Sequence, residues 1–502
     1  MTGCSFLKTD CAETRIVKVS GKGGRRIVQG LSYNRIFAPL VLALLGAAIS
    51  SYHLGYKALG ASEAYSALAA AQPTVRGVAQ TAMTFDPGKP VLYHLLLHWF
   101  CVWFGASELA LRSFSIVFAP ASIVMVFGYG TELFGSEVGW AAAAMWMVNP
   151  LSVLFARWAR MYSMFVAFTL AHLLAMTKLR RRMTKIGTLT AGVLGAAMLY
   201  THLGGLLIIG ADLVVVVREF RRERRSAGLP AIAIALLLFV PFMPAAVWQG
   251  RALLFGHWVD WIGVAHCTGV TRAVAVGIAG ISCLWLALGG RHLGPRSESA
   301  VCCSVYVLIP LIGLLTGSIV IRPMFTVRYA APSFAVAGVL VAWALDCKGF
   351  RALKDGTTAI TALLIFLLPL TYSVLDQPWR GIAHRVAETA DKQETIFFEA
   401  GFFSADGAIG PEDGGFPQGF FLVPFKYYFK GPNPNAAVPG NDPLRARQLI
   451  ESAIRKAGGA WLISGKIRPE ALAELPKGSS FHIDYDRNFS QVLVFHVRLT
   501  TA

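Results

Sequence analysis

Residues 59–112 read LGASEAYSALAAAQPTVRGVAQTAMTFDPGKPVLYHLLLHWFCVWFGASELALR and decide how the rest of the chain is interpreted. They follow the first long apolar segment and carry Glu63 and Asp86 in a chain that is otherwise mostly apolar and basic. The apolar run 91–104 is shorter than the roughly 20 residues that a helix needs to cross a bilayer. We therefore predict that residues 57–112 form one external loop, with 91–104 as a juxtamembrane or re-entrant helix.

The composition places the chain in a membrane. Of its 502 residues, 55% are hydrophobic and only 15% are charged, and the mean hydropathy is +0.55. Long uncharged runs recur from end to end, which is typical of a polytopic α-helical membrane protein. The net charge of +18 comes from short basic clusters between apolar runs, so it indicates cytoplasmic loops rather than a nucleic-acid partner. The eight cysteines show no metal-ligand spacing and no disulfide framework.

The basic clusters set the predicted topology. Residues 1–35 are polar and basic without a cleavage site, and we interpret them as a cytoplasmic tail. Clusters at 178–182, 218–225, 291–296 and 348–354 are then cytoplasmic as well. The apolar stretch between the first two must cross twice, with an external break at 201–205. The transmembrane domain 36–375 is predicted to have about eleven spans. They lie near 36–56, 113–130, 138–155, 162–178, 231–248, 268–288, 300–320, 331–347 and 357–375, with two short crossings within 186–217.

From residue 376 the chain loses its membrane-length apolar runs. We predict that residues 376–502 form a small α/β domain on the external face. Helices are expected at 381–390 and 443–459, and strands at 394–403, 460–465, 481–486 and 490–499, the last two as a hairpin. The segment 404–442 is rich in Gly, Pro, Asp and Asn and is predicted to be loop.

Several polar residues fall on the predicted external side, each next to a span. They are Glu63, Asp86, Lys89, Arg112, Arg157, Arg160, Tyr162, His202, Arg322, Arg328 and Tyr329. Arginines at the membrane boundary suit the phosphate of a lipid carrier. A carboxylate there suits deprotonation of an acceptor hydroxyl or amine, and a phosphate leaving group needs only charge stabilisation besides.

Each of these residues also has a plain structural interpretation. Arginines at the boundary often reach toward lipid headgroups. Glu63 is also a good first-turn carboxylate of a helix, and Asp86 before Pro87-Gly88 is a good turn residue. His202 can cap a bent pair of helices, and Tyr162 and Tyr329 suit an interfacial aromatic belt.

Six loose motifs occur in an ordered series along the chain. They are SEAYS at 62–66, DPGKPVLYHLLLHWFCVWFGASELALRSFS at 86–115, ELFGSEVGWAAAAMWMVNPLSVLFARWARMYSMF at 132–165, LYTHLGGLL at 199–207, VRYAAPSFA at 327–335 and QPWRGIAHRV at 377–386. In this order they resemble the C-type (GT-C) membrane glycosyltransferases of the protein mannosyltransferase, aminoarabinose transferase and RgtA-like superfamily. The resemblance covers about residues 36–400.

The resemblance implies transfer of a sugar from a polyprenyl-phosphate donor to a glycan, lipid or protein acceptor at the external membrane face. It assigns Glu63 to the catalytic acid of the family. Arg112, Arg160 and Arg328 match basic positions near the carrier phosphate, His202 matches a histidine in the turn between the fifth and sixth spans, and Tyr162 and Tyr329 are candidate substrate contacts.

The chain departs from the family pattern in two places. Ser62-Glu63 stands where an Asp-Glu pair is usual, and Lys89-Pro90-Val91 stands where His-Pro-Pro is usual. Asp86 is therefore a candidate second carboxylate and Lys89 a candidate phosphate donor. With one acid of the pair missing, no metal is assigned to the site, although a divalent metal stays an open alternative. No cofactor is predicted, since the lipid-phosphate sugar is the donor substrate.

Three functions are thus open. The leading hypothesis is a glycosyltransferase of a bacterial inner membrane, multi-pass, with a cytoplasmic N-terminus and Glu63 or Asp86 as base. The alternative is a transporter or flippase of a lipid-linked sugar, against which the near absence of acids in the predicted spans is an argument. The third is a scaffold that only presents the external domain.

Overall fold

A computed structural model describes residues 39–85, 89–223, 227–248, 296–320, 325–373, 379–399, 416–438, 443–464, 479–484 and 492–499. A first helix, Pro39–Ser51, precedes the labelled elements. The α-helices up to residue 239 are α2 (Ala61–Ala70), α3 (Val75–Phe85), α4 (Leu92–Phe104), α5 (Glu108–Ile116), α6 (Phe118–Phe134), α7 (Ser136–Met147), α8 (Pro150–Ala156), α9 (Tyr162–Arg181), α10 (Lys185–Thr201), α11 (Gly205–Glu223) and α12 (Leu229–Phe239).

The second half of the chain contains both helices and strands. The helices are η1 (Val240–Phe242), α16 (Ser297–Val320), η2 (Val327–Ala330), α17 (Ala331–Asp346), α18 (Phe350–Ser373), α19 (Trp379–Thr389), α20 (Phe416–Tyr428) and α21 (Pro443–Ala457). The strands are β1 (Thr395–Glu399), β2 (Asn435–Ala437), β3 (Gly459–Ser464), β4 (Ser479–Asp484) and β5 (Leu493–Leu499).

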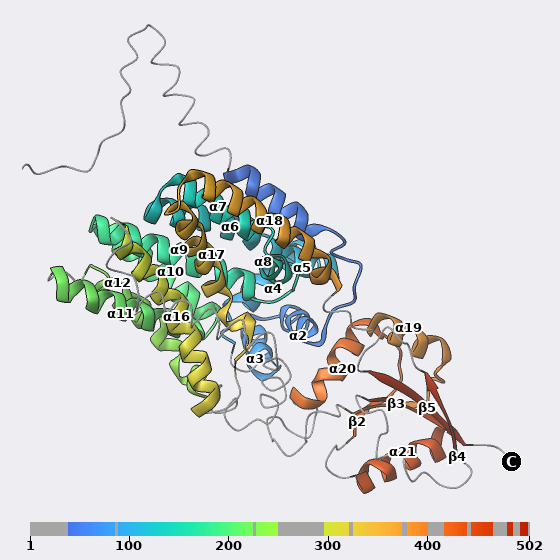
Figure 1. Ribbon diagram of the computed structural model, residues 1–502. Helices are drawn as coiled ribbons and strands as arrows, with labels where there is room; N and C mark the ends of the chain where they lie inside the picture. Colours follow the sequence, from blue (N-terminus) through green and yellow to red (C-terminus); the bar gives the residue numbers. More distant parts are fainter. Residues whose placement is uncertain are drawn as a thin grey trace, which may run out of the picture.

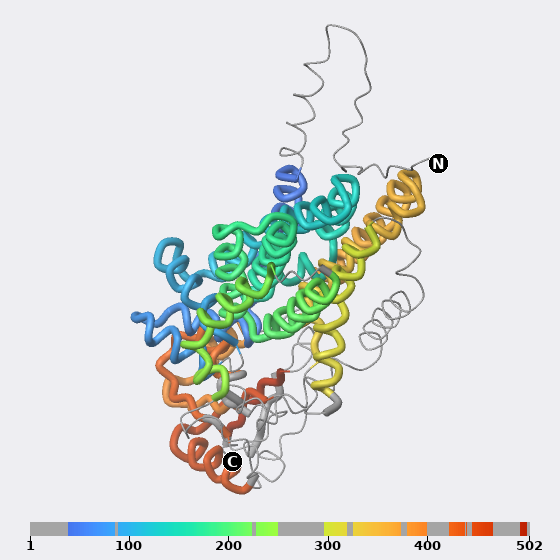
Figure 2. The backbone as a smooth tube through the Cα atoms, turned by 90° about the vertical axis from the view of Figure 1, so that its left-hand side faces the viewer, coloured from blue at the N-terminus to red at the C-terminus, as the bar shows by residue number. Residues whose placement is uncertain are grey.

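The helices up to α18 form one bundle, and the strands with α19, α20 and α21 gather at one end of it (Figures 1 and 2). Within the described residues, six helices are long and apolar enough to cross a membrane, or seven if one bent pair is a single span. The six are Glu108–Phe134, Tyr162–Arg181, Leu229–Trp248, Ser297–Ser318, Val327–Asp346 and Phe350–Tyr372. The chain is therefore a multi-pass helical membrane protein.

The described residues do not reach the predicted count of about eleven spans. The first helix ends at Ser51, so it is shorter than the predicted span 36–56. The predicted break at 201–205 exists, since α10 ends at Thr201 and α11 begins at Gly205. Neither helix combines the length and the hydropathy of a membrane span. The predicted span 268–288 lies outside the described residues.

The predicted span 138–155 is a bent pair, α7 and α8, with an angle of 60° between the two helices. The bend has a local cause. The Asn149 side chain accepts a hydrogen bond from the Leu151 amide at 2.9 Å and caps α8, and Pro150 stands at the first turn of that helix. Proline lacks the N–H that would continue the helix before it, so α7 ends here and a new axis begins.

Close contact between α6 and α7 depends on glycine. A Cβ atom built on Gly130 would lie 3.0 Å from the Gly139 Cα, and one built on Gly139 would lie 2.7 Å from the Phe127 carbonyl oxygen. In lipid the hydrophobic effect does not drive helices together. Small residues at a crossing let two membrane helices approach closely and associate through van der Waals contacts. This pair therefore forms a tight unit on which α9 and α17 pack.

The first loop contains the helices α2, α3 and α4, and it ends in α5, the beginning of the membrane-length helix Glu108–Phe134. The predicted helix at 91–104 is α4, with 13 residues, and its side chains Trp99, Val102, Trp103 and Phe104 are exposed by 53%, 62%, 80% and 69%. Such an exposed aromatic and aliphatic face suits a helix lying at a membrane boundary. That placement relative to the bilayer stays a prediction.

The strands form one five-stranded sheet in the order β2-β1-β3-β5-β4. β1 pairs in parallel with β2 and β3, whereas β5 pairs in antiparallel fashion with β3 and β4. All six residues of β3 are buried, because helices cover both faces of the sheet. Trp379 of α19 and Phe421 of α20 pack on one face, and Ile450 of α21 packs on the other.

The predicted helices at 381–390 and 443–459 and the predicted hairpin of the last two strands are present as α19, α21 and β4–β5. The prediction of a loop across 404–442 was wrong, because helix α20 and strand β2 both lie within it. Phe421 and Phe425 of α20 are almost fully buried against the sheet. Burial of these aromatic side chains outweighs the Gly- and Pro-rich composition around them.

Helix α20 also joins the sheet to the bundle, where it packs along α2 (Figure 1). The Tyr428 hydroxyl accepts a hydrogen bond from the Leu59 amide at 2.6 Å, and the Tyr427 hydroxyl donates to the Ala106 carbonyl at 2.7 Å. Arg380 of α19 forms an ion pair with Glu108 of α5. The C-terminal sheet is thereby fastened to the first loop.

Candidate functional site

Glu63 and Arg112 form a buried, bidentate ion pair. Glu63 lies in the first turn of α2, where its Oε2 also accepts from the Gly60 amide at 2.9 Å. Arg112 of α5 donates from Nε to Oε1 at 2.9 Å and from Nη2 to Oε2 at 2.8 Å. The two side chains are 1% and 5% exposed. Parallel N–H···O bonds of this kind fix both partners in position.

The Glu63 carboxylate has a fourth donor, the Ala159 amide, at 3.0 Å from Oε1. Two oxygens accepting four hydrogen bonds use the whole capacity of a carboxylate. Arg112 in turn donates to the carbonyls of Leu54, Lys57 and Ala58. Glu63 thus connects α2, α5 and the turn at 157–161 through its hydrogen bonds. Its predicted role as base stays a prediction.

The turn at 157–161 connects this junction to the other predicted residues. Arg160 donates from Nη1 to the Ser62 carbonyl at 2.9 Å and to Ser66 Oγ at 3.4 Å. Arg157 donates to the Ser50 carbonyl at 2.9 Å and lies 4.6 Å from the ring centre of Tyr372. Burial lowers the pKa of Arg157 from its ordinary value. Both arginines therefore hold the turn against neighbouring backbone rather than extending into lipid.

A second group of predicted residues meets around Tyr329. Lys89 donates from Nζ to the Tyr329 hydroxyl at 3.0 Å, although it is 4% exposed. The ring of His202 lies 4.9 Å from that of Tyr329 and 4.9 Å from that of Phe165, measured between centroids. Residues from three distant parts of the chain, at 89, 202 and 329, thus share one site.

Arg328 lies beside the same aromatic rings. Its Cζ is 5.5 Å from the ring centre of Tyr329 and 5.9 Å from those of Tyr162 and Trp158. Guanidinium groups are attracted to the faces of aromatic rings at such distances. These rings therefore lie around the cation of Arg328, and Lys89 contacts one of them, the ring of Tyr329.

His202 contributes a hydrogen-bond donor to this group. Its Nδ1 accepts from the Gly204 amide at 2.9 Å. The pKa of His202 lies well below its ordinary value, mainly because the ring is buried. The positive charges of Lys89, Arg328 and Arg160 lower this pKa further. The ring is therefore neutral near pH 7 and carries its proton on Nε2, which has no hydrogen-bond partner among the described residues.

Two further polar groups of the site were not predicted. Trp158 Nε1 and Thr326 Oγ1 are buried and likewise have no hydrogen-bond partner within the part of the chain that the structure describes. The Trp158 ring is tilted against that of Tyr162, with 5.4 Å between ring centroids. The Arg-Met-Tyr signature at 160–162 drew attention to its neighbours, but nothing in the sequence marked this tryptophan.

We name the set Lys89, Trp158, Arg160, His202, Arg328 and Tyr329 the donor cluster. Its members are cations or carry N–H or O–H groups, an arrangement suited to an anion with several oxygens. Of the predicted residues, Glu63 and Arg112 lie in the adjacent ion pair, Tyr162 lies against the cluster, and Asp86 is outside the described residues. No group of three or more potential metal ligands occurs in the described ranges.

A separate buried polar chain runs within the bundle. His172 Nε2 and Asp212 Oδ2 are 2.9 Å apart, and the Tyr306 hydroxyl donates to Asp212 Oδ1 at 2.8 Å. Both His172 and Asp212 are fully buried. This role of Asp212 was not predicted, because a lone Asp in an apolar run does not show its partners.

Part of the chain matches a known protein family. Residues 88–248 match the sequence model of the family described as dolichyl-phosphate-mannose-protein mannosyltransferase. No curated protein sequence matches the chain significantly.

Two solved structures of ArnT from Cupriavidus metallidurans are similar in fold. One is bound to undecaprenyl phosphate and aligns with a TM-score of 0.58 at 13% identity, over 92% of this chain and 98% of that one. The other is the apo state, with a TM-score of 0.52 at 14% identity, over 94% and 98%. The predicted resemblance is confirmed: this chain has the fold of the GT-C superfamily of membrane glycosyltransferases.

Proposed function

We propose that this protein transfers a sugar from a polyprenyl-phosphate-linked donor to an acceptor at the external membrane face. The supporting observation is the donor cluster, in which Lys89 and Arg328 lie against Tyr329 beside the neutral ring of His202. In transfer from a lipid phosphate, negative charge grows on the departing phosphate as the sugar bond breaks. Fixed N–H donors and cations at that point stabilise the transition state more than the ground state.

The ligand of the similar ArnT structure, undecaprenyl phosphate, supports this class of donor. In our proposal the phosphate contacts Lys89, Arg160 and Arg328 and accepts a hydrogen bond from His202 Nε2. Tyr162 and Tyr329 supply ring surface for the sugar or the first isoprene unit. The lipid chain leaves along the apolar exterior of the bundle.

Of the two predicted acids, we propose Asp86 as the base and Glu63 as the residue that positions the site. Both Glu63 oxygens already accept two hydrogen bonds each, two of the four from Arg112, which leaves no lone pair for an acceptor proton. Asp86 stands three residues before Lys89 in the sequence. The base then removes a proton from the acceptor hydroxyl or amine as it attacks the anomeric carbon.

The C-terminal sheet is proposed to bind the acceptor or to limit access to the site. Helix α20 fastens this sheet to α2, the helix that carries Glu63. Both parts are proposed to lie on the external side of a bacterial inner membrane, with the N-terminus in the cytoplasm. The basic ends of α9 and α11 support this orientation.

The test uses purified protein in lipid with radiolabelled polyprenyl-phosphate sugars and a membrane extract as the source of acceptors. We expect turnover of one donor in the wild type, loss of turnover with retained donor binding in Asp86→Asn, and weakened donor binding in Lys89→Met. Absence of turnover with every donor, together with donor binding that Lys89→Met leaves unchanged, would overturn the proposal.

The buried pair His172 and Asp212 favours a second candidate, a transporter or flippase of a lipid-linked sugar. Ionisable pairs inside a helix bundle often serve transport. Protein reconstituted in sealed vesicles would move a fluorescent polyprenyl-phosphate sugar between leaflets on this hypothesis, and His172→Asn would slow the movement. Turnover without movement between leaflets excludes it.

A further inference from the structure

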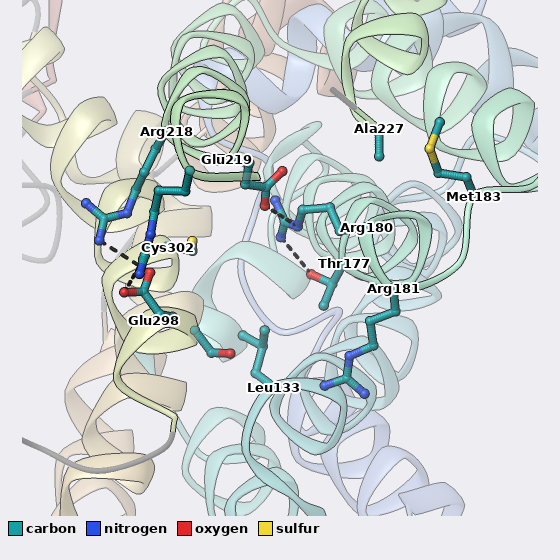
Figure 3. Close-up of a pocket in the computed structure, with 12 residues that line it drawn as sticks. Leu133, Thr177, Arg180, Arg181, Met183, Arg218, Glu219, Ala227, Glu298 and Cys302 are labelled. Atoms are coloured by element: carbon teal, nitrogen blue, oxygen red, sulfur yellow. Dashed lines mark hydrogen bonds and ion pairs between the residues drawn. The ribbon is translucent and has the colours of Figure 1, made fainter. Parts of the chain in front are cut away.

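A large pocket lies at the end of the bundle opposite the donor cluster. Its volume is about 880 Å³, within the range of pockets that hold small molecules and headgroups. It opens between the C-terminal ends of α9 and α11 and the beginning of α16 (Figure 3). Helix α9 begins at Tyr162 and ends at Arg181, so its 20 residues separate the two sites by about 30 Å.

Positive charge exceeds negative charge in this pocket. Four arginines line it, Arg180, Arg181, Arg218 and Arg222, against the two acids Glu219 and Glu298. Arg181 pairs with Glu132, which lies just outside the lining, at 2.8 Å. Among the described lining residues, four arginines thus stand against two acids, and Arg218 and Arg222 both contact the single carboxylate of Glu298.

The four arginines differ in how firmly they are held. Arg180 forms the floor, 12% exposed, where it contacts Glu219 at 3.3 Å, Thr177 at 3.1 Å and Tyr306 at 3.3 Å. Arg181, Arg218 and Arg222 are 59%, 41% and 54% exposed at the mouth. Exposed guanidinium groups keep their rotational freedom and can exchange a protein carboxylate for a ligand oxygen at small cost.

The wall of the pocket is apolar. Leu133, Met183, Ala227 and Cys302 line it, and Met183 is 58% exposed. The pocket thus combines a cationic mouth with an apolar side, at the ends of α9 and α16, two helices that are long enough to span a bilayer. A ligand that matches both parts has a phosphate joined to an apolar body.

We propose that this pocket binds the phosphate group of an acidic phospholipid in the leaflet opposite the donor cluster. The phosphate accepts hydrogen bonds from Arg218 and Arg222, displacing one oxygen of Glu298, and the glycerol and first acyl carbons lie along Leu133 and Met183. Basic pockets between membrane helices bind anionic headgroups in this way. The proposal is independent of the sugar-transfer activity, since the two sites lie at opposite ends of α9.

Native mass spectrometry of the full chain in detergent tests this directly. Phosphatidylglycerol or phosphatidylcholine is added stepwise, and the affinity for the first retained lipid is measured. We expect preferential retention of phosphatidylglycerol, and the double variant Arg218→Gln/Arg222→Gln should weaken it roughly tenfold or more. Arg351→Gln is the matched control, because Arg351 is 96% exposed on α18 and lies outside the pocket.

Glu298→Gln separates a binding site from a set of ion pairs that only join helix ends. If the pocket binds phosphate, removal of the competing carboxylate strengthens phosphatidylglycerol retention. If the arginines only join α11 to α16, retention in this variant equals that of the wild type, and the proposal fails. Should the double variant not fold, Arg181→Gln at the mouth takes its place, with a weaker loss of retention expected.

A second arm distinguishes a lipid from a soluble phosphate compound. The thermal unfolding midpoint is measured with added phosphatidylglycerol and, separately, with inorganic phosphate, since a ligand that binds only the folded state raises it. We expect a rise with the lipid that is absent in Arg218→Gln/Arg222→Gln. Equal retention of both lipids, or a rise with inorganic phosphate alone, would overturn the assignment to a phospholipid.

Discussion

Arg112 holds Glu63 through two parallel hydrogen bonds of 2.9 and 2.8 Å, and the two residues are 49 positions apart in the chain. The Ala159 amide, in the turn before α9, donates a further hydrogen bond to the same Glu63 carboxylate. Arg160, the next residue, belongs to the donor cluster. A buried ion pair therefore fixes the turn that carries Arg160, the residue that we propose contacts the donor phosphate.

This pair leads to a prediction about stability. Glu63→Gln removes the negative charge and turns an amide N–H₂ toward the guanidinium donors, which leaves Arg112 buried without its counter-charge. We expect the free energy of unfolding to fall by about 3–5 kcal/mol, measured by denaturant titration in mixed micelles. Asp355→Asn, an acid 67% exposed in an i,i+4 pair, should leave it unchanged. Full stability of Glu63→Gln with loss of turnover would instead support Glu63 as the base.

The donor cluster predicts how donor affinity depends on charge. Lys89→Met keeps the length of the side chain but removes an ammonium group that is 4% exposed. Since a hydrogen bond to a charged group contributes about 1.5–3 kcal/mol, the dissociation constant of the donor should rise by about 10- to 100-fold. Lys348→Gln, on the exposed surface after α17, is the control and should bind the donor as the wild type does. Unchanged binding in Lys89→Met would remove Lys89 from the site.

His202 predicts a dependence of stability on pH. Because its pKa is lowered in the folded protein, the unfolded chain binds a proton below its ordinary pKa of about 6.5 while the folded chain does not. The contribution of His202 to stability is thus constant above that pH and falls by about 1.4 kcal/mol per pH unit below it. Thermal unfolding between pH 7.5 and 5.5, as rough limits of this window, measures the effect. His202→Asn should flatten the profile, and a parallel profile in the variant would contradict the neutral ring.

The contact between the sheet and the first loop predicts a local change in dynamics. Tyr428→Phe removes the oxygen that accepts from the Leu59 amide, a bond expected to contribute about 1 kcal/mol. Hydrogen exchange at residues 59–63 should become faster in this variant. Tyr427→Phe is the matched control, because its hydroxyl bonds to Ala106 instead and its loss should leave exchange at Leu59 unchanged. Equal exchange in both variants would show that α20 does not stabilise the loop.

The crossing of α6 and α7 predicts a strong effect of one methyl group. In Gly139→Ala the new Cβ would lie 2.2 Å from Thr131 Oγ1 and 2.7 Å from the Phe127 carbonyl oxygen, so the helices must separate. We expect a loss of about 1–3 kcal/mol in the free energy of unfolding. Gly338→Ala in α17 meets no atom within 4 Å and should stabilise its helix by up to about 1 kcal/mol. Equal stabilities of the two variants would contradict the close crossing.

Properties that depend on near neighbours in the chain were predictable. Hydropathy identified a multi-pass helical membrane protein but not its number of spans, because burial of apolar surface in lipid sums over consecutive residues. The helices α19 and α21 and the hairpin β4–β5 followed from local periodicity and turn residues, and the break at 201–205 followed from the basic clusters on either side of it. The motif order, read over the whole chain, indicated the GT-C fold.

Properties that depend on contacts between distant residues required the tertiary structure. Glu63 is a first-turn carboxylate in the sequence, but its partners Arg112 and Ala159 lie 49 and 96 positions away. Likewise α20 forms in a Gly- and Pro-rich segment, because Phe421 and Phe425 find a sheet to cover. The meeting of Lys89, His202 and Tyr329 has the same origin. Hydropathy and helix signals act over a few residues, whereas a polar side chain acquires its chemistry from whichever groups the folded chain places within about 3 Å of it.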